Sequence, residues 1–168
     1  RALVYDVRNG TSNGVIMAGG VSGGIYKSID DGGTWVRKSP TGDLFSVTAI
    51  AQDPRVGFQD TWYYAGGEAL GNSASGTGGF YFGKGVYKST DNGETWSHLS
   101  GLNSTTVESF NHRADLVSKV VVDPTTGNVY AAALDAIYRS TDGGTTWSSV
   151  LTSGSAGWAS DMLTDIIV

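Results

Sequence analysis

An octapeptide of the form Ser-x-Asp-x-Gly-x-Thr-Trp occurs three times in this chain and constrains its fold more than any other feature. The copies begin at Ser28, Ser89 and Ser140. Three copies within 168 residues are too many to arise by chance. Self-similarity on this scale is typical of an array built from one supersecondary unit. The chain is therefore expected to contain three similar units.

Each octapeptide follows a short segment rich in Ile, Val and Tyr, which are residue types that favour β-strands. These segments lie at 24–27, 85–88 and 136–139. A middle strand candidate precedes each of them, at 15–18, 62–65 and 129–132. An innermost candidate comes before that, at 3–7, 47–51 and 117–122. The residues that follow each Trp supply a fourth strand. Four short antiparallel strands in every unit predict the blades of a β-propeller.

The predicted fold is all-β: a partial β-propeller with about three four-stranded antiparallel blades and one strand of a fourth. We expect blade 1 at about 1–40, blade 2 at about 44–100, blade 3 at about 114–151 and the start of blade 4 at about 160–168. Closed propellers have roughly four to eight blades, so three blades would leave two blade faces uncovered. We therefore expect either a fragment of a longer protein or one chain of a ring that closes by oligomerisation.

The octapeptide has the residue types of a stable turn. Its Asp can accept hydrogen bonds from N–H groups of its own turn. Its Gly adopts a backbone conformation that is closed to other residues, and its Trp can bury a large ring against its own blade. This turn-forming role is expected for Ser28, Asp30, Gly32, Trp35, Ser89, Asp91, Gly93, Trp96, Ser140, Asp142, Gly144 and Trp147. A calcium or glycan site at these turns is the alternative.

The three octapeptides resemble the Asp-box, or BNR repeat, found in sialidases, in sortilin-type propellers and in propeller hydrolases that cleave xyloglucan. The resemblance extends over the whole chain at blade spacing, and it is specific for the repeat rather than for one of these families. In those families the Asp-box lies at the blade periphery, away from the active centre. The resemblance thus implies that Asp30, Asp91 and Asp142 are structural.

The longest departure from the repeat is 66–84, between the second and third strands of blade 2. Insertions in repeat proteins usually map to one face and often carry function. This segment is a Gly/Ser-rich loop that ends in Phe80, Tyr81 and Phe82. Aromatic side chains on one face form a platform for sugar rings, so these three are candidate ligand-binding residues. The alternative is that they pack on the blade.

A second departure, 101–114, connects blade 2 to blade 3 and carries His112 and Arg113. Such a connection approaches the central axis of a propeller, where this pair could bind an anionic or hydroxylated ligand. The alternative is a solvated loop. His98, which follows the second octapeptide, is expected at the surface.

A glycosidase requires two carboxyl groups that flank the scissile bond. Glu68 stands where the xyloglucan-cleaving propellers carry a catalytic Asp, and this resemblance makes it a candidate acid or base. The sequence offers no second carboxylate in a matching context. Asp161 and Asp165 lie on the expected fourth innermost strand, where one of them could face the channel. A sialidase is not supported, because the arginines are not arranged to bind a carboxylate and the Phe/Tyr-Arg-Ile-Pro signature is missing.

The composition excludes several other classes of protein. The chain has no Cys, so it cannot form disulfides or thiolate metal sites. No His/Asp/Glu grouping has metal-ligand spacing, and we expect neither a metal nor a cofactor. The formal net charge of −5 and scattered basic residues argue against nucleic acid as a partner. No apolar run is long enough to span a membrane, and no signal peptide is visible.

The sequence therefore predicts a secreted or cell-surface bacterial protein, a propeller segment resembling the sortilin-type repeats of extracellular proteins. It would recognise a protein or polysaccharide ligand through 66–84 and 101–114. The alternative is part of a glycoside hydrolase that resembles the xyloglucan-cleaving propellers. Further partners would be the remaining blades of the same protein or other copies of the chain.

Overall fold

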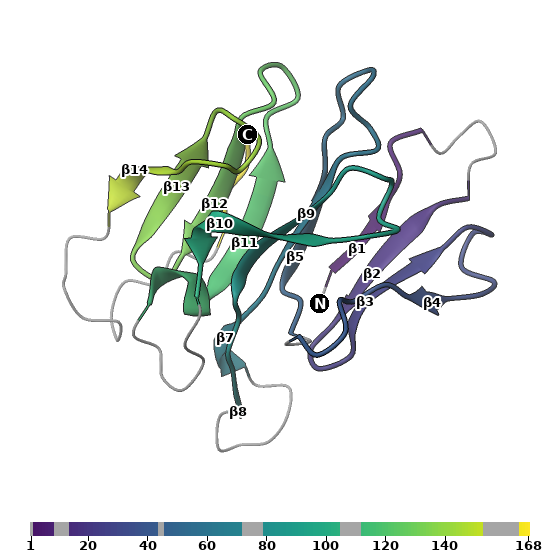
Figure 1. Ribbon diagram of the computed structural model, residues 1–168, viewed down its shortest axis with the longest axis horizontal. Coiled ribbons are helices and arrows are strands. Elements are labelled where there is room, and N and C mark those ends of the chain that lie inside the picture. The colour runs from purple at the N-terminus through teal and green to yellow at the C-terminus, as the bar shows by residue number, and fades with distance from the viewer. Residues whose placement is uncertain (1, 9–13, 44–45, 72–78, 105–111, 153–164) are drawn as a thin grey trace.

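The computed structural model describes residues 2–8, 14–43, 46–71, 79–104, 112–152 and 165–168, which form three four-stranded antiparallel sheets side by side in chain order (Figure 1). The first sheet contains β1 (Ala2–Tyr5), β2 (Ile16–Gly20), β3 (Gly24–Ser28) and β4 (Val36–Arg37). The second contains β5 (Ala49–Gln52), β6 (Trp62–Ala65), β9 (Gly85–Ser89) and β10 (Ser97–Asn103). The third contains β11 (Val117–Val122), β12 (Val129–Ala133), β13 (Ala136–Ser140) and β14 (Ser148–Thr152).

Each sheet is a meander in which strands that are consecutive in the repeat are hydrogen-bonded neighbours. The predicted class, an all-β partial propeller with four-stranded antiparallel blades, is thus confirmed. Only 165–168 of the expected start of blade 4 is described, and these four residues form no strand. The rest of that segment lies outside the described residues.

Two elements interrupt the repeat. A two-stranded antiparallel ribbon, β7 (Glu68–Gly71) and β8 (Gly79–Tyr81), occupies the segment that we expected to be a loop. A short 3-10 helix, η1 (Arg113–Asp115), precedes the third sheet. The ribbon forms because the two arms of the insertion pair with each other, with Glu68 opposite Tyr81. An insertion between two adjacent strands can extend their hairpin in this way.

The first strands of the three sheets, β1, β5 and β11, are neighbours in space. Main-chain and side-chain hydrogen bonds join the sheets close to these strands. Val47 N donates to Gly20 O of the first sheet over 3.0 Å, and Thr48 Oγ1 donates to Val117 O of the third over 2.5 Å. The sheets therefore meet along their innermost strands, as blades do in a propeller.

The three inner strands of the middle sheet, β5, β6 and β9, are buried on both faces, as expected for a blade that has a neighbour on each side. Successive side chains of a strand point to opposite faces of the sheet. On β6, Trp62 and Tyr64 enter a core shared with Met17 of the first sheet. Tyr63 and Ala65 enter the core that is shared with the third sheet. All four β6 side chains are buried, since each face of the sheet has a neighbouring blade.

Candidate functional site

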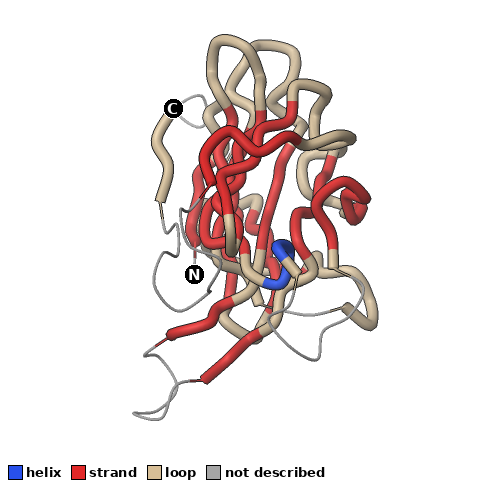
Figure 2. The backbone as a smooth tube through the Cα atoms, turned by 90° about the vertical axis from the view of Figure 1, so that its left-hand side faces the viewer, coloured by secondary structure: helices blue, strands red, loops and turns tan. Residues whose placement is uncertain are grey.

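The two ends of the blades carry different kinds of loop. Turns in an antiparallel meander alternate between the ends of the sheet. The turn between the third and fourth strands, which holds the octapeptide, therefore shares one end with the turn between the first and second strands. We call this the Asp-box end. The ribbon follows β6 and η1 precedes β11, so both departures from the repeat lie at the opposite end, which we call the ribbon end. Figure 2 shows the ribbon projecting from the molecule near η1.

At the Asp-box end, the three octapeptides repeat one hydrogen-bond pattern. In the second copy Ser89 Oγ donates to Asp91 Oδ1 over 2.7 Å, and Thr95 donates from its N to Oδ1 over 2.9 Å and from its Oγ1 to Oδ2 over 2.5 Å. Asp30 and Asp142 accept the same three bonds from their own turns. These carboxylates thus bind the chain that immediately surrounds them.

The same hydrogen bonds hold the three carboxyl groups in the ionised form. Burial of Asp91 opposes its ionisation, but the bonds from Thr95 and Ser89 outweigh this effect and lower its pKa to about 2. The pKa of Asp30 is lowered mainly by hydrogen bonds from Thr34, and that of Asp142 mainly by hydrogen bonds from Thr146. A carboxylate that accepts several such bonds is stabilised relative to the neutral acid.

The octapeptide Trp packs against the preceding sheet as well as its own. Trp96 is 9% exposed and belongs to the core that contains Met17 and Ile25 of the first sheet. Its ring also meets the ring of Tyr64 edge-on, with centroids 4.7 Å apart. The expectation of burial against its own blade was therefore incomplete. Trp35, in the first sheet, is 39% exposed.

At the ribbon end, the two segments that we singled out as ligand-binding candidates are packed together. Gly83 N donates to Asp115 O over 2.8 Å, and Val117 N donates to Gly66 O over 3.0 Å. Gly67 has a φ of 103°, and a Cβ at this position would collide with the carbonyl of Asp115. Glycine is required here by both conformation and space. The base of the ribbon is thus fixed against η1.

The ribbon presents the predicted residues as follows. Glu68 is the first residue of β7, is half-buried and lies opposite Tyr81. Tyr81 and Phe82 are half-buried at the end of β8. Phe80 is part of β8, but its side chain lies outside what the structure describes. The neighbouring carboxylate, Asp115, is fully buried.

His112 caps η1 and is fixed by it. Its Nδ1 accepts a hydrogen bond from Ala114 N over 3.1 Å, and its own N donates to Asp115 Oδ2 over 2.7 Å. An imidazole that accepts at Nδ1 carries its proton on Nε2. Nε2 therefore remains as a donor.

Arg113 is exposed but is anchored to the third sheet. Its Nη1 donates to Tyr138 Oη over 3.2 Å, and its guanidinium carbon lies 5.2 Å from the centre of that ring. Tyr138 in turn donates to Asp135 over 3.0 Å. Burial raises the pKa of Tyr138, and the Asp135 carboxylate raises it further, so the phenol stays protonated. The sequence did not predict that Tyr138 and Asp135 anchor Arg113. The Tyr that recurs in the third strand of each unit was the one feature that could have pointed to Tyr138.

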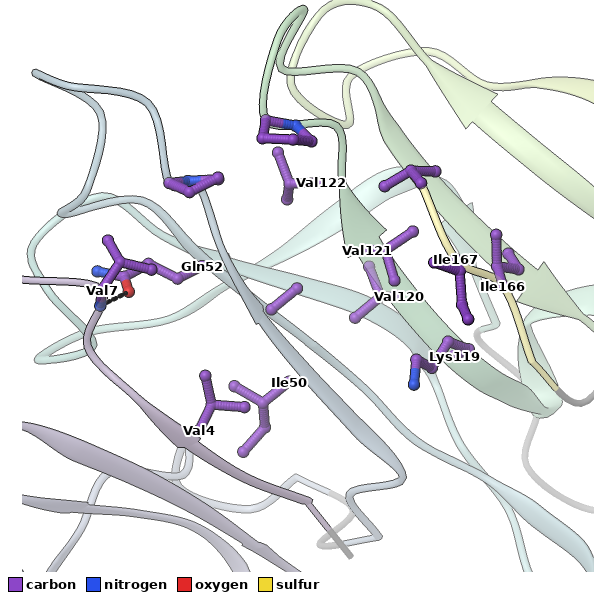
Figure 3. A pocket seen from close by; sticks show the side chains of 14 residues that line it. Val4, Val7, Ile50, Gln52, Lys119, Val120, Val121, Val122, Ile166 and Ile167 are labelled. Carbon is purple, nitrogen blue, oxygen red and sulfur yellow. Dashed lines mark hydrogen bonds between the residues drawn. The ribbon is translucent and has the colours of Figure 1, made fainter.

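A cavity of about 460 Å³ lies along the innermost strands and extends from Val4 and Ile50 to Ile167 (Figure 3). Its described lining is apolar apart from Gln52 and Lys119, and it includes no carboxylate. Lys119 forms an ion pair of 3.1 Å with Asp165. Asp161, the other acid considered for the channel, lies outside the described residues.

Within the described part of the chain, no group of three or more His, Cys, Asp and Glu side chains is placed to hold a metal ion. None of the helices in that part is long and apolar enough to cross a membrane.

A family model for the BNR/Asp-box repeat matches residues 87–98 and 138–149, which contain the whole of the second and third octapeptides. Solved propeller structures match the fold. This chain has a partial β-propeller fold and carries Asp-box repeats. Its first octapeptide lies outside the matched residues but makes the same bonds around Asp30.

The propeller segment is similar to a GH74 enzyme from Niastella koreensis, with a TM-score of 0.60, 19% identity and 90% of this chain covered. It is also similar to the GH74 xyloglucanase from Xanthomonas campestris (TM-score 0.58, 20% identity, 88% covered). YCF48 from Cyanidioschyzon merolae matches with a TM-score of 0.54 and 15% identity over 88% of the chain. The segment spans 22%, 20% and 35% of these three chains, respectively. No curated protein sequence matches it.

Proposed function

We propose that this propeller segment is a recognition module that binds a polysaccharide at its ribbon end. The observation that carries the proposal is the packing of the ribbon base, at Gly66, Gly67 and Gly83, against η1 and the start of β11. This packing brings together the described parts of the two departures from the repeat that the sequence singled out. Function in repeat proteins concentrates in such departures.

The chemistry of this surface suits a sugar chain. Tyr81 and Phe82 are partly accessible aromatic rings, and flat rings offer large rigid contact area with little loss of side-chain entropy. Arg113 and the Nε2 of His112 supply hydrogen-bond donors for hydroxyl groups. Because η1 and Tyr138 hold these donors, little conformational entropy is lost on binding. A secreted bacterial setting belongs to the same proposal and is supported by the likeness to a xyloglucanase.

The test is titration of the chain with xyloglucan, xylan and mixed-linkage β-glucan, followed by calorimetry or affinity electrophoresis. Tyr81→Ala and Arg113→Ala should each weaken binding by about fivefold or more, a change that corresponds to roughly 1 kcal/mol. The matched control is Phe58→Ala, which removes an exposed aromatic ring at the Asp-box end and should leave binding unchanged. If no polysaccharide in the panel binds while an extended peptide does, the ligand class is wrong.

A second candidate function, part of a glycoside hydrolase, is favoured by one observation. Glu68 lies at the base of the ribbon and is partly accessible, and two of the similar structures are GH74 enzymes. The release of reducing sugars from the same panel, with its loss in Glu68→Gln, would support this function. Binding without hydrolysis supports the recognition module.

A further inference from the structure

The innermost strands of the first two blades are each followed by the same pair of residues, an Asp and, two positions later, an Arg. The pairs are Asp6 with Arg8 and Asp53 with Arg55. Both Asp residues are buried. In each pair the Arg donates from its N and its Nε to Oδ1 of the Asp and from its Nη2 to Oδ2, over 2.6 to 3.1 Å. A bidentate contact of this kind fixes the plane of the guanidinium group.

Each guanidinium group that is fixed in this way also reaches the following blade. Arg8 Nη1 donates to Asp60 Oδ1 over 2.7 Å, and Arg8 Nη2 donates to Asn92 Oδ1 over 3.1 Å. Arg55 Nη1 donates to Thr126 O over 2.9 Å. Asp60 and Thr126 both lie in the turn between the first and second strands of the following blade. Arg8 and Arg55, which we call the arginine latches, therefore tie neighbouring blades together at the Asp-box end.

A glycine makes room for the second arginine latch. Gly57 and Gly127 occupy the same position of their turns, four residues after the Asp, with φ of 86° and 76°. A Cβ at Gly127 would collide with the guanidinium group of Arg55, whereas nothing lies within 4 Å of a Cβ at Gly57. In the third blade Thr125 stands where the first two blades carry Arg, and Asp123 accepts hydrogen bonds from its own turn. The turn that holds Gly127 thus receives an arginine latch and does not supply one.

Main-chain hydrogen bonds join the same pairs of blades at the ribbon end. Val47 N donates to Gly20 O between the first and second blades, and Val117 N donates to Gly66 O between the second and third. At the base of the ribbon the main chain approaches its neighbours so closely that a Cβ at Gly66 or Gly67 would collide with a carbonyl oxygen. Because close-packed contacts transmit small displacements, a tilt of one blade would disturb this base.

We propose that the arginine latches set the orientation of neighbouring blades from the Asp-box end, and that Arg55 thereby positions the base of the ribbon against η1. The ribbon belongs to the second blade and η1 precedes the third, and Arg55 ties these two blades together. Arg55 is then a positioning residue for ligand binding at the ribbon end, a role that rests on the proposed polysaccharide binding. Arg8 ties the first blade to the second and has no such role.

The first measurement is amide hydrogen exchange by NMR, which requires no ligand. Arg55→Ala should speed exchange of the Val117 and Gly83 amides, which hold the ribbon base, by about tenfold or more and should leave the Val47 amide unchanged. Arg8→Ala is the matched control, and it should speed exchange of the Val47 amide alone. Equal acceleration of all three amides by either variant would indicate a general loss of stability. That outcome, or no acceleration at all, overturns the proposal.

A second variant tests the same latch without removing a charge. Gly127→Ala places a methyl group where the guanidinium group of Arg55 lies, whereas Gly57→Ala introduces similar backbone strain without a collision. Gly127→Ala should therefore speed exchange of the Val117 amide, and Gly57→Ala should not. Equal effects of the two substitutions would assign the change to backbone strain and would contradict a latch at Arg55.

Titration with xyloglucan then tests the link to the ribbon end. Arg55→Ala and Gly127→Ala should each weaken its binding by about threefold or more, because a displaced ribbon must be ordered again when the ligand binds. Arg8→Ala and Gly57→Ala should bind it as the wild type does. Equal binding by all four variants overturns the positioning role. If the wild type does not bind xyloglucan, the proposed function is wrong for this ligand, and exchange of the Gly83 amide still decides whether Arg55 positions the ribbon.

Discussion

The ammonium group of Lys88 donates a hydrogen bond to the carbonyl of Gly143, which lies in the Asp-box of the next blade. Tyr63 Oη donates to the same carbonyl over 3.3 Å. Burial lowers the pKa of Lys88, while the nearby Asp142 and Asp53 carboxylates oppose this effect. The Asp-box therefore has two roles: it closes its own turn through its Asp, and it offers a backbone acceptor to the preceding blade.

Loss of this inter-blade bond should lower stability. We expect Lys88→Met, which keeps most of the aliphatic stem, to reduce the free energy of unfolding by about 1.5–3 kcal/mol, as for other hydrogen bonds to charged groups. The Lys119→Met variant removes an ion pair between partly exposed groups and should cost less than about 1 kcal/mol. Urea denaturation of the two variants provides the comparison. Equal losses would mean that Lys88 does not join the blades.

The tryptophans of the first two Asp-boxes should differ sharply in their contribution to stability. Trp96→Ala empties a site in a closed core and should cost about 3–5 kcal/mol. Trp35→Ala removes a ring that is 39% exposed and should cost far less. Urea denaturation of the two variants measures both losses. Similar losses at the two positions would contradict the packing of the ring on the preceding blade.

Acid should destabilise the segment through its Asp-boxes. The pKa of Asp91 falls from an ordinary value of 3.8 to about 2 on folding, so its contribution is fully present above about pH 4. That contribution is lost as the pH falls toward 2, because the unfolded chain then binds the proton first. The pKa values of Asp30 and Asp142 are lowered in the same direction. Unfolding free energies measured from pH 6 to pH 2 should therefore decline most steeply below pH 4.

The control for acid sensitivity is Asp91→Asn, which removes one titrating group. This variant should be less stable at neutral pH and should show a shallower decline in acid. If its pH profile is parallel to that of the wild type, the carboxylate of Asp91 does not control the acid transition.

A methyl group at Gly67 should separate the ribbon from η1. Gly67→Ala introduces both backbone strain and a collision with the carbonyl of Asp115. Gly57→Ala is matched for strain, since its φ is 86°, but no atom lies within 4 Å of the added Cβ. We expect the Gly57 variant to lose about 1 kcal/mol and the Gly67 variant to lose more. Only the Gly67 variant should also lose polysaccharide binding, which calorimetry would reveal.

The sequence marks the segments of the ribbon and of η1 as interruptions of the repeat, but it does not predict that the two pack against each other. The Gly/Ser-rich insertion and the connection around His112 were both visible as interruptions of the repeat. Their contact depends on Gly67 meeting Asp115, residues far apart in the chain, and no local pattern encodes such a meeting. His98, expected at the surface, is instead half-buried and stacked on Tyr87 with ring centres 4.5 Å apart. His98 is half-buried because its cross-strand neighbour, Tyr87, covers one face of its ring.

The sequence by itself determined the blades, because strand propensity and turn chemistry act within a few residues: the Asp91 turn closes on Thr95, only four positions away. The tertiary structure alone decided which neighbour each face received. Trp96 and Trp35 occupy the same position of the same octapeptide, yet one is buried and the other is partly exposed. The difference arises because an aromatic ring is buried only where another part of the chain covers it. The first sheet covers Trp96 through Met17 and Ile25.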